Sequence, residues 1–150
     1  MRVFDSLAAL RDAVGEHLGY SDWHTVTQEQ VTAFADATGD HQWIHVDPVR
    51  AASSPFGGTI AHGYLTLSLI PMLVVGVFKV DGVRMGLNYG CNKVRFPAPL
   101  PTGSKVRAGV TVASFEDIPG GAHIVNEVSI ERDGGDKPVC VAQTVVRYYT

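Results

Sequence analysis

The segment from 38 to 64 (TGDHQWIHVDPVRAASSPFGGTIAHGY) holds the residues of this chain that could carry out acid–base chemistry. Asp40 follows a glycine, and His45 comes five residues later in a stretch too irregular to be one helix, so a loop can aim both side chains at one point. An aspartate stabilises a nearby imidazolium, and the histidine keeps the carboxylate ionised. Such a pair can hold a water molecule and remove a proton from it, which accelerates a reaction by roughly 10²- to 10⁴-fold. Asp40 and His45 are therefore the candidate catalytic residues.

Each of these residues taken alone also has a structural interpretation. An aspartate after a glycine is common in turns, and a single histidine is more often a hydrogen-bonded structural residue. The chemical interpretation is favoured because His62-Gly63 and a long apolar segment follow in the same chain. Asp40, His45 and His62, with His41, could also be imagined as a metal cluster, but no HExxH-like spacing or cysteine ligand supports one. We expect no metal.

A glycine pair at 57 and 58 is the other feature that could suggest a bound cofactor. No Lys-Ser or Lys-Thr follows it to complete a phosphate-binding loop, and no strand precedes it as in a dinucleotide-binding turn. The sequence therefore predicts a chain reversal there and no nucleotide cofactor.

Helices predominate in the first half of the chain. Residues 6 to 14 have a short helical pattern, and a strand is expected near 20 to 26. A firmer helix begins at Thr27, because Thr27 and Gln30 have the spacing of a capping box, and ends at Gly39. Asp47-Pro48 is a second helix start, which predicts a short turn of helix over 49 to 53. Residues 60 to 78 predict a buried helix, apolar on every side, that meets no solvent.

Strands make up the second half. Four long strands are expected at about 83 to 96, 104 to 115, 121 to 132 and 137 to 149, separated by turns rich in proline, glycine and aspartate. Val106 and Val110 alternate with Arg107 and Thr111, as in a sheet with one buried face. Helices followed by strands indicate an α+β fold. An antiparallel meander after an apolar helix predicts a curved sheet wrapped around that helix.

The composition narrows the class of protein. A chain of 150 residues with 45% hydrophobic content can bury one core, so we expect a single domain over 1 to 150. Charged residues make up 18% and the net charge is -3, which argues against nucleic acid as a partner. Residues 60 to 78 are interrupted by polar side chains and Pro71, so they do not predict a membrane span. Cys91 and Cys140 are isolated, and we expect reduced thiols in a cytoplasmic protein.

The chain resembles the MaoC-like family in its hydratase 2 signature, which here reads GDHQWIHVDP at 39 to 48 and AHG at 61 to 63. The resemblance extends from Phe34 to Leu69 and to the proline-rich NKVRFPAPLPT at 92 to 102, so it covers most of the chain. Gln42-Trp43 stands where many members have Asn-Pro, with the spacing from Asp40 to His45 unchanged. The fold that this resemblance implies is the hotdog fold, which agrees with a curved sheet around a central helix.

The resemblance also implies an activity, that of an (R)-specific enoyl-CoA hydratase. Asp40 and His45 match the catalytic pair of the family, and Gly63 matches the glycine whose backbone N–H receives the thioester oxygen. A glycine at a helix start offers this N–H at the positive end of the helix dipole without a side chain in the way. His62 and Gln42 are further candidates for oxyanion or substrate binding. The expected product is an (R)-3-hydroxyacyl-CoA, with coenzyme A part of the substrate and no separate cofactor.

Coenzyme A and a second subunit are the expected binding partners. Arg84, Lys93 and Arg95 are cations that could contact coenzyme A, and each could equally be a solvated strand residue. A curved sheet leaves open edges, which a second copy of the chain commonly covers. The resemblance implies the same homodimer, with an active site at its interface.

Three alternatives remain at this point. A dehydratase acting on acyl carrier protein would use the same reversible chemistry. A hotdog thioesterase would need an acidic residue on the central helix, and 60 to 78 contains no Asp or Glu. A non-catalytic acyl-binding subunit would have no need of both Asp40 and His45.

Overall fold

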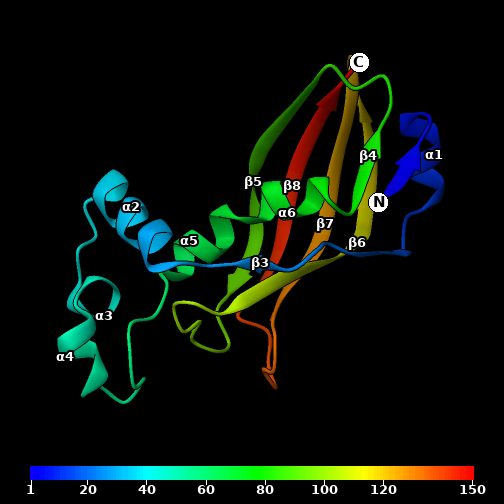
Figure 1. Cartoon of the computed structure of the whole chain (residues 1–150). Coiled ribbons are helices and arrows are strands. Elements are labelled where there is room, and N and C mark those ends of the chain that lie inside the picture. The colour runs from blue at the N-terminus through cyan, green and yellow to red at the C-terminus, as the bar shows by residue number, and fades with distance from the viewer.

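A curved antiparallel sheet and the helical segment that it partly surrounds dominate the computed structural model, which describes all 150 residues (Figure 1). The elements follow one another as β1 (Arg2–Phe4), α1 (Leu7–Asp12), β2 (His17–Tyr20), β3 (His24–Thr25), α2 (Gln28–Thr38), α3 (Trp43–Val46), α4 (Pro48–Ala52), α5 (Gly63–Ser68), α6 (Ile70–Val75), β4 (Phe78–Val80), β5 (Met85–Arg95), β6 (Lys105–Ile118), β7 (Gly121–Arg132) and β8 (Cys140–Tyr149). The predicted α+β class and the wrapped sheet are confirmed.

The four long strands predicted from the sequence are β5 to β8. Their alternation is as expected, because Val106 and Val110 of β6 are fully buried while Arg107 and Thr111 are partly exposed. The strand order is β2-β6-β7-β8-β5, with β3 also paired to β6. The expectation of a simple meander is therefore wrong for β5, which lies at the far edge beside β8.

The segment between β5 and β6 explains that placement. It runs against the residues that precede α5, where Ile60 forms an isolated bridge with Pro101 and the Ala61 N–H donates to the Leu100 carbonyl at 2.8 Å. The proline-rich stretch thus carries the chain from β5, at one edge of the sheet, past β8 and β7 to β6. It also holds the residues before Gly63 in place.

The central helical segment is shorter than predicted and is divided. α5 begins at Gly63 because Ile60 and Ala61 are bonded to the β5–β6 segment. Pro71 lies in the first turn of α6, where its missing N–H is tolerated but cannot continue the hydrogen bonds of α5. Leu69 between them has helical angles, so the two short helices follow one another closely.

The prediction that this helix meets no solvent is wrong. Leu65, Leu69 and Leu73 are buried in the core. In contrast, Tyr64 is 69% exposed and Val75 is 67% exposed. The reason is that the sheet curves around one side of the helices only, as Figure 1 shows. None of the helices has both the length and the hydropathy of a membrane-spanning segment.

The elements before α2 agree with the prediction in the helix α1 and differ from it in the strands. The short helix expected near 6 to 14 is α1. The Ser6 side chain caps it by accepting a hydrogen bond from the Ala9 N–H. The strand expected near 20 to 26 is instead two short strands, β2 and β3. They are separated at Ser21, whose hydroxyl accepts from the Ala108 N–H at 2.9 Å. A small parallel pair, β1 with β4, was not predicted.

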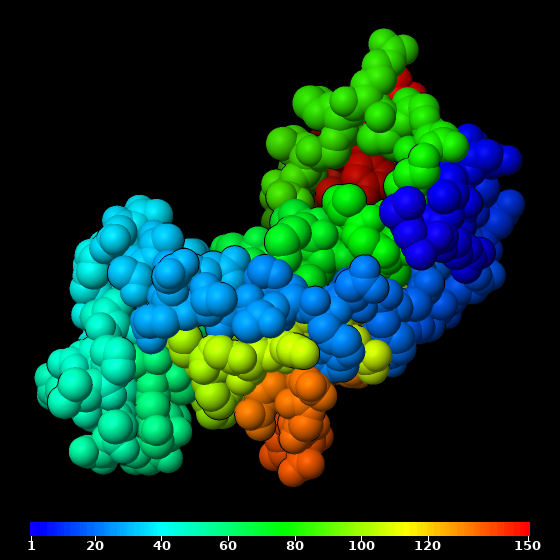
Figure 2. All heavy atoms as spheres, in the orientation of Figure 1, coloured from blue at the N-terminus to red at the C-terminus, as the bar shows by residue number.

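Two of the helices around the candidate catalytic residues, α2 and α4, begin and end within one residue of the predicted positions, whereas α3 was not predicted. Thr27 caps α2 by accepting from the Gln30 N–H at 3.2 Å, although the Gln30 side chain contacts His24 instead of closing a capping box. Asp47 caps α4 through the Arg50 N–H. Helices α2, α3 and α4 form a lobe that projects from the sheet (Figure 2).

Candidate active site

Asp40 lies in the turn that ends α2. Gly39 adopts the left-handed conformation, with φ of 80°, and its N–H donates to the Ala35 carbonyl. Glycine reaches this conformation without the steric cost that a side chain brings, so it is suited to end the helix. The Asp40 side chain is 53% exposed and comes directly after this reversal. The turn therefore presents a carboxylate at the edge of the lobe.

His45 is buried and is held by a backbone carbonyl. The expectation that it lies in a loop is wrong, because it belongs to the one-turn helix α3. Its Nδ1 donates to the Ile60 carbonyl at 2.6 Å. A carbonyl oxygen only accepts, so this bond places the proton of the neutral ring on Nδ1. Nε2 then keeps its lone pair, which is the form that a general base requires.

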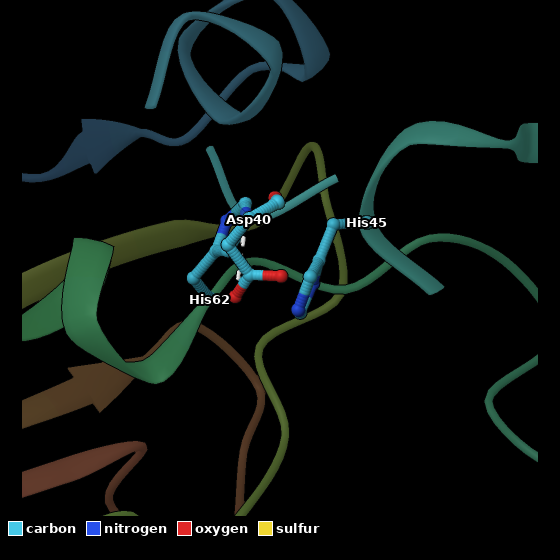
Figure 3. A group of neighbouring side chains, drawn as sticks. All are labelled: Asp40, His45 and His62. Atoms are coloured by element: carbon cyan, nitrogen blue, oxygen red, sulfur yellow. Dashed lines mark hydrogen bonds and ion pairs between the residues drawn. The ribbon is translucent and has the colours of Figure 1, made fainter. Parts of the chain in front are cut away.

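His62 joins the two candidate catalytic residues. Its Nε2 donates to the backbone carbonyl of Asp40 at 2.9 Å and lies 3.9 Å from Oδ2 of the same residue. Its ring stacks on that of His45, with centroids 3.8 Å apart and planes 24° apart. Figure 3 shows the three side chains in one group. One ligand atom from each of the three residues lies within 4.8 Å of the others.

The surroundings of His45 favour its neutral form. Burial lowers the pKa of His45 because the imidazolium loses contact with water, and the nearby His62 lowers it further. The bond to the Ile60 carbonyl and the charge of Asp40 act in the opposite direction but do not reverse the shift. His45 is therefore neutral over more of the physiological range than a free histidine.

Gly63 is the first residue of α5, and its N–H belongs to the first turn, where no intrahelical acceptor exists. A Cβ added at this position would lie 2.9 Å from the Phe96 ring, so a side chain there would require that ring to shift. A hollow of about 280 Å³ lies beside it and is lined partly by His45, Gly63, Thr66 and Phe96. The structure thus brings Gly63 and His45 to one cavity.

The remaining candidate binding residues lie in three different places. Gln42 is exposed at the start of α3, near the turn, but its side chain makes no capping hydrogen bond. Arg84 donates its N–H to the Tyr149 carbonyl near the C-terminus, at the far end of the sheet from α3 (Figure 1). Lys93 and Arg95 line a hollow of about 340 Å³ on the outer face of the sheet. None of these three cations contacts Asp40 or His45 within this chain.

The imagined metal cluster is only partly assembled. Asp40, His45 and His62 lie together, whereas His41 turns away to form an ion pair with Asp36 at 2.8 Å. That hydrogen bond raises the pKa of His41. Nε2 of His62 is already bonded to the Asp40 carbonyl, and Nδ1 of His45 to the Ile60 carbonyl, so each ring has one nitrogen left. The expected absence of a metal stays a prediction.

Gln28 is a residue of the site region that sequence reasoning missed. Its side chain donates to the His45 carbonyl at 2.8 Å and accepts from the Thr59 hydroxyl at 2.6 Å. It therefore links α2, α3 and the segment before α5. The contact between Phe34 and the site was also missed. The centroid of its ring lies 4.9 Å from that of His62. Only the helical pattern of α2, which directs Phe34 inward, could have suggested a contact.

A second and larger cavity lies along the helices beyond the site. It has a volume of about 480 Å³, and its lining is mainly apolar. Leu67, Ile70, Pro71 and Val74 of α5 and α6 form one side, while β5 and β8 form the other. Figure 2 shows a hollow above α6 with atoms of β8 at its floor. Leu67 follows Gly63 by four residues, so the cavity begins about 6 Å along the helix from Gly63.

Comparison with known proteins identifies the family. The MaoC-like domain matches residues 9–132. This chain belongs to the MaoC-like family. Its sequence is 55% identical over 149 residues to 3-hydroxyacyl-thioester dehydratase Z of Mycobacterium tuberculosis, a match that covers 99% of each chain. With this membership and a relative so similar over its whole length, the protein is an enzyme of the hydro-lyase class.

Solved structures agree on the fold. The (R)-hydratase from A. caviae, involved in PHA biosynthesis, has a TM-score of 0.71 at 25% identity, over 85% of this chain and 92% of that one. The monoamine oxidase regulatory protein from Archaeoglobus has a TM-score of 0.76 at 23% identity, over 99% and 97% of the two chains. The resemblance to MaoC-like proteins with a hotdog fold, stated from the sequence, is confirmed.

Proposed function

We propose that this MaoC-like enzyme adds water reversibly to a trans-2-enoyl-CoA and produces an (R)-3-hydroxyacyl-CoA. The observation that carries the proposal is the convergence of the Asp40 carboxylate and the His45 ring beside the N–H of Gly63. This reaction needs an acid–base pair that activates water and an N–H donor that stabilises an oxyanion. The names of the relatives, a 3-hydroxyacyl-thioester dehydratase and an (R)-hydratase, support the same reaction.

In the proposed mechanism Asp40 and His45 hold the reacting water. Its oxygen attacks C3 of the enoyl thioester while Nε2 of His45 accepts a proton from it. The electrons of the double bond move toward the thioester carbonyl, and the Gly63 N–H stabilises the negative charge on that oxygen. A proton is then delivered to C2 from the acid–base pair, which returns to its starting state. Dehydration follows the same steps in reverse.

His62 has a positioning role in this proposal. By donating to the Asp40 carbonyl it fixes the turn that carries the carboxylate, and by stacking it fixes the plane of the His45 ring. Correct placement of catalytic groups accounts for much of an enzyme's rate enhancement. His62 therefore acts through its two neighbours rather than on the substrate.

The larger cavity is proposed to receive the acyl chain. Its lining by α5 and α6 begins at Leu67, about 6 Å along the helix from Gly63, and continues away from Asp40 and His45, as a chain attached to a bound thioester requires. Coenzyme A would extend to the opposite side, toward solvent. Lys93 and Arg95 lie on the outer face of the sheet and Arg84 lies near the C-terminus, so their proposed contact with coenzyme A depends on the arrangement of two subunits.

A homodimer formed along β5 is part of the proposal. β5 is an edge strand of 11 residues, and nearly all of them are exposed. Met85, Leu87 and Tyr89 add exposed apolar side chains to this edge. A long unpaired edge of this kind is usually covered by another strand. Light scattering should give twice the mass of one chain, and Leu87→Asp should reduce that mass; a monomeric wild type would contradict the dimer.

The test of the reaction follows the consumption of substrate and the formation of two alternative products in parallel. Purified protein is mixed with crotonyl-CoA and longer enoyl-CoA substrates, and the loss of enoyl-thioester absorbance, the release of free thiol and the formation of the (R)-3-hydroxy product are followed. Loss of absorbance with (R) product and without thiol is the expected result. Thiol release would instead indicate a thioesterase, which the absence of Asp and Glu from 60 to 78 disfavours.

A dehydratase acting on acyl carrier protein is distinguished by the carrier. The same enoyl group is presented on coenzyme A and on acyl carrier protein, and the two values of kcat/KM are compared. We expect the coenzyme A substrate to be preferred. A strong preference for the protein-bound substrate would reassign the carrier while leaving the roles of Asp40 and His45 intact.

A further inference from the structure

Asn126, at the centre of β7, is a buried polar residue without an evident partner. Its side chain is 1% exposed, and Oδ1 accepts no hydrogen bond from the chain. Burying an amide oxygen without a donor costs free energy, and native proteins rarely leave one in that state. A donor from outside the chain is therefore expected to reach Asn126.

Asn126 faces the interior of the curved sheet, toward the helices. Its neighbours two residues away on β7, Ile124 and Val128, are both fully buried on the same face. The register places Asn126 opposite Thr144 of β8, and Thr144 opposite Cys91 of β5. Directly opposed residues share a face of a sheet. Asn126, Thr144 and Cys91 consequently form a row of polar or polarisable side chains across the inner face.

Two members of this row line the larger cavity, and Asn126 lies next to one of them, Thr144, without lining the cavity itself. Thr144 and Cys91 are among the lining residues, and Asn88 adds a second amide on β5. The opposite side, made by α5 and α6, is almost entirely apolar. The cavity therefore combines an apolar wall with a localised group of hydrogen-bonding side chains, which is the composition of a site that fixes one polar atom of an otherwise apolar ligand.

We propose that Asn126 and Thr144 bind a hydroxyl group carried by the acyl chain of the substrate. The substrate class is thus an oxygenated acyl thioester rather than a plain alkyl one. The hydroxyl hydrogen is donated to Oδ1 of Asn126, and the Thr144 hydroxyl can donate to the hydroxyl oxygen. The inference rests on the proposed function only for the thioester end of the ligand, since the subsite itself requires no turnover.

The first experiment is equilibrium binding to the whole protein. Saturated acyl-CoA molecules of one chain length are compared by calorimetry, with no hydroxyl or with a hydroxyl at successive carbons beyond C3. Because these ligands cannot be hydrated, the result is independent of catalysis. We expect one positional isomer to bind about tenfold more tightly than the unsubstituted chain, as one well-placed hydrogen bond allows. If every hydroxylated isomer binds more weakly, water or another group satisfies Asn126 and the proposal is wrong.

Variants identify the side chains responsible. Thr144→Val keeps the size of the side chain and removes its hydroxyl, and Asn126→Leu removes the amide at similar volume. Both should abolish the preference for the hydroxylated isomer, and the first is informative even where the second does not fold. Thr111→Val makes the same chemical change on the outer face and should preserve the preference. A preference unaffected by Thr144→Val and by folded Asn126→Leu would overturn the assignment.

The same isomers as trans-2-enoyl-CoA substrates then test turnover. If the protein binds the hydroxylated chain but hydrates none of the series, the subsite stands and the proposed reaction fails. If it hydrates plain and hydroxylated chains with equal kcat/KM and equal affinity, the reaction stands and the subsite fails. Preferred turnover of the isomer that binds most tightly supports both.

Discussion

The projecting lobe and the sheet are stabilised by different kinds of interaction. In the sheet, β6 and β7 pair over 12 registered positions, and their inward side chains are fully buried aliphatic residues such as Val110 and Ile130. The lobe is held by individual polar contacts, among them Gln28 with His45 and His62 with Asp40. The comparison indicates that the sheet carries most of the stability, whereas the lobe carries the chemistry. A substitution in one region should therefore leave the property of the other unchanged.

The largest effect should follow from removing the acid–base pair. Asp40→Asn and His45→Gln should each lower kcat by about 10²- to 10⁴-fold, because neither variant can accept a proton from water at that position. Tm should change little, since Asp40 is half exposed and glutamine can still donate to the Ile60 carbonyl. Steady-state hydration of crotonyl-CoA and thermal unfolding measure the two properties. Full activity in either variant would contradict the mechanism.

The next effect concerns the start of α5. Gly63→Ala should lower kcat by about a hundredfold to a thousandfold, since the Cβ would clash with Phe96 and disturb the oxyanion donor. The double variant Gly63→Ala with Phe96→Ala separates the two causes. If the clash alone is responsible, the double variant recovers activity. If the N–H must be reached without a side chain in the way, activity stays low.

A core substitution should give the opposite result. Ile130→Ala in β7 should lower the free energy of unfolding by about 2 to 5 kcal/mol, because a fully buried side chain leaves a cavity. Denaturant unfolding measures this loss. The kcat per folded molecule should stay near the wild-type value at a temperature where the variant is folded. A large fall in kcat would show that sheet and lobe are not separable.

A polar contact inside the lobe should produce an intermediate effect on activity. Gln28→Ala removes the link between the His45 carbonyl and Thr59 and should lower kcat/KM by about tenfold, as loss of alignment allows. Gln30→Ala is the matched control, because Gln30 belongs to the same helix and contacts His24 instead. Equal effects of the two changes would assign Gln28 a general role in helix stability.

The smallest effect is a displacement of the pH profile. Because burial lowers the pKa of His45, the fall in kcat/KM on the acid side should be centred below 6.5, and activity should be complete above it. His62 contributes to that lowering, so His62→Gln should move the centre upward while glutamine preserves the bond to Asp40. The charged or titratable groups that act on His45 are Asp40 and His62. An unchanged profile would leave His62 a purely structural residue.

Individual elements show how far the sequence could predict the fold. Helix caps at Thr27 and Asp47 were predicted correctly, because a cap depends on residues three positions apart. The position of β5 was not, since the choice between β6 and β8 as its partner depends on where the proline-rich segment crosses the fold. The helical turn that carries His45 also escaped prediction, because one turn has no detectable periodicity.

The exposure of the central helix illustrates a different limit. Its apolar pattern correctly predicted burial of Leu65, Leu69 and Leu73, but the same pattern includes Val75 and Met72, which are exposed. An apolar pattern indicates that a helix surface is more stable when it is buried. It does not indicate whether the same chain or a second subunit buries it. The proposed dimer is one way in which that surface could be covered.

The sequence by itself determined the family, the α+β class and the candidate catalytic pair, because these depend on residue types at short, fixed spacings. Only the tertiary structure decided how the pair is oriented. The Ile60 carbonyl that sets the tautomer of His45 and the stacking of His62 both join segments 15 or more residues apart. Such contacts are fixed by packing of the whole chain, so local sequence contains no direct record of them.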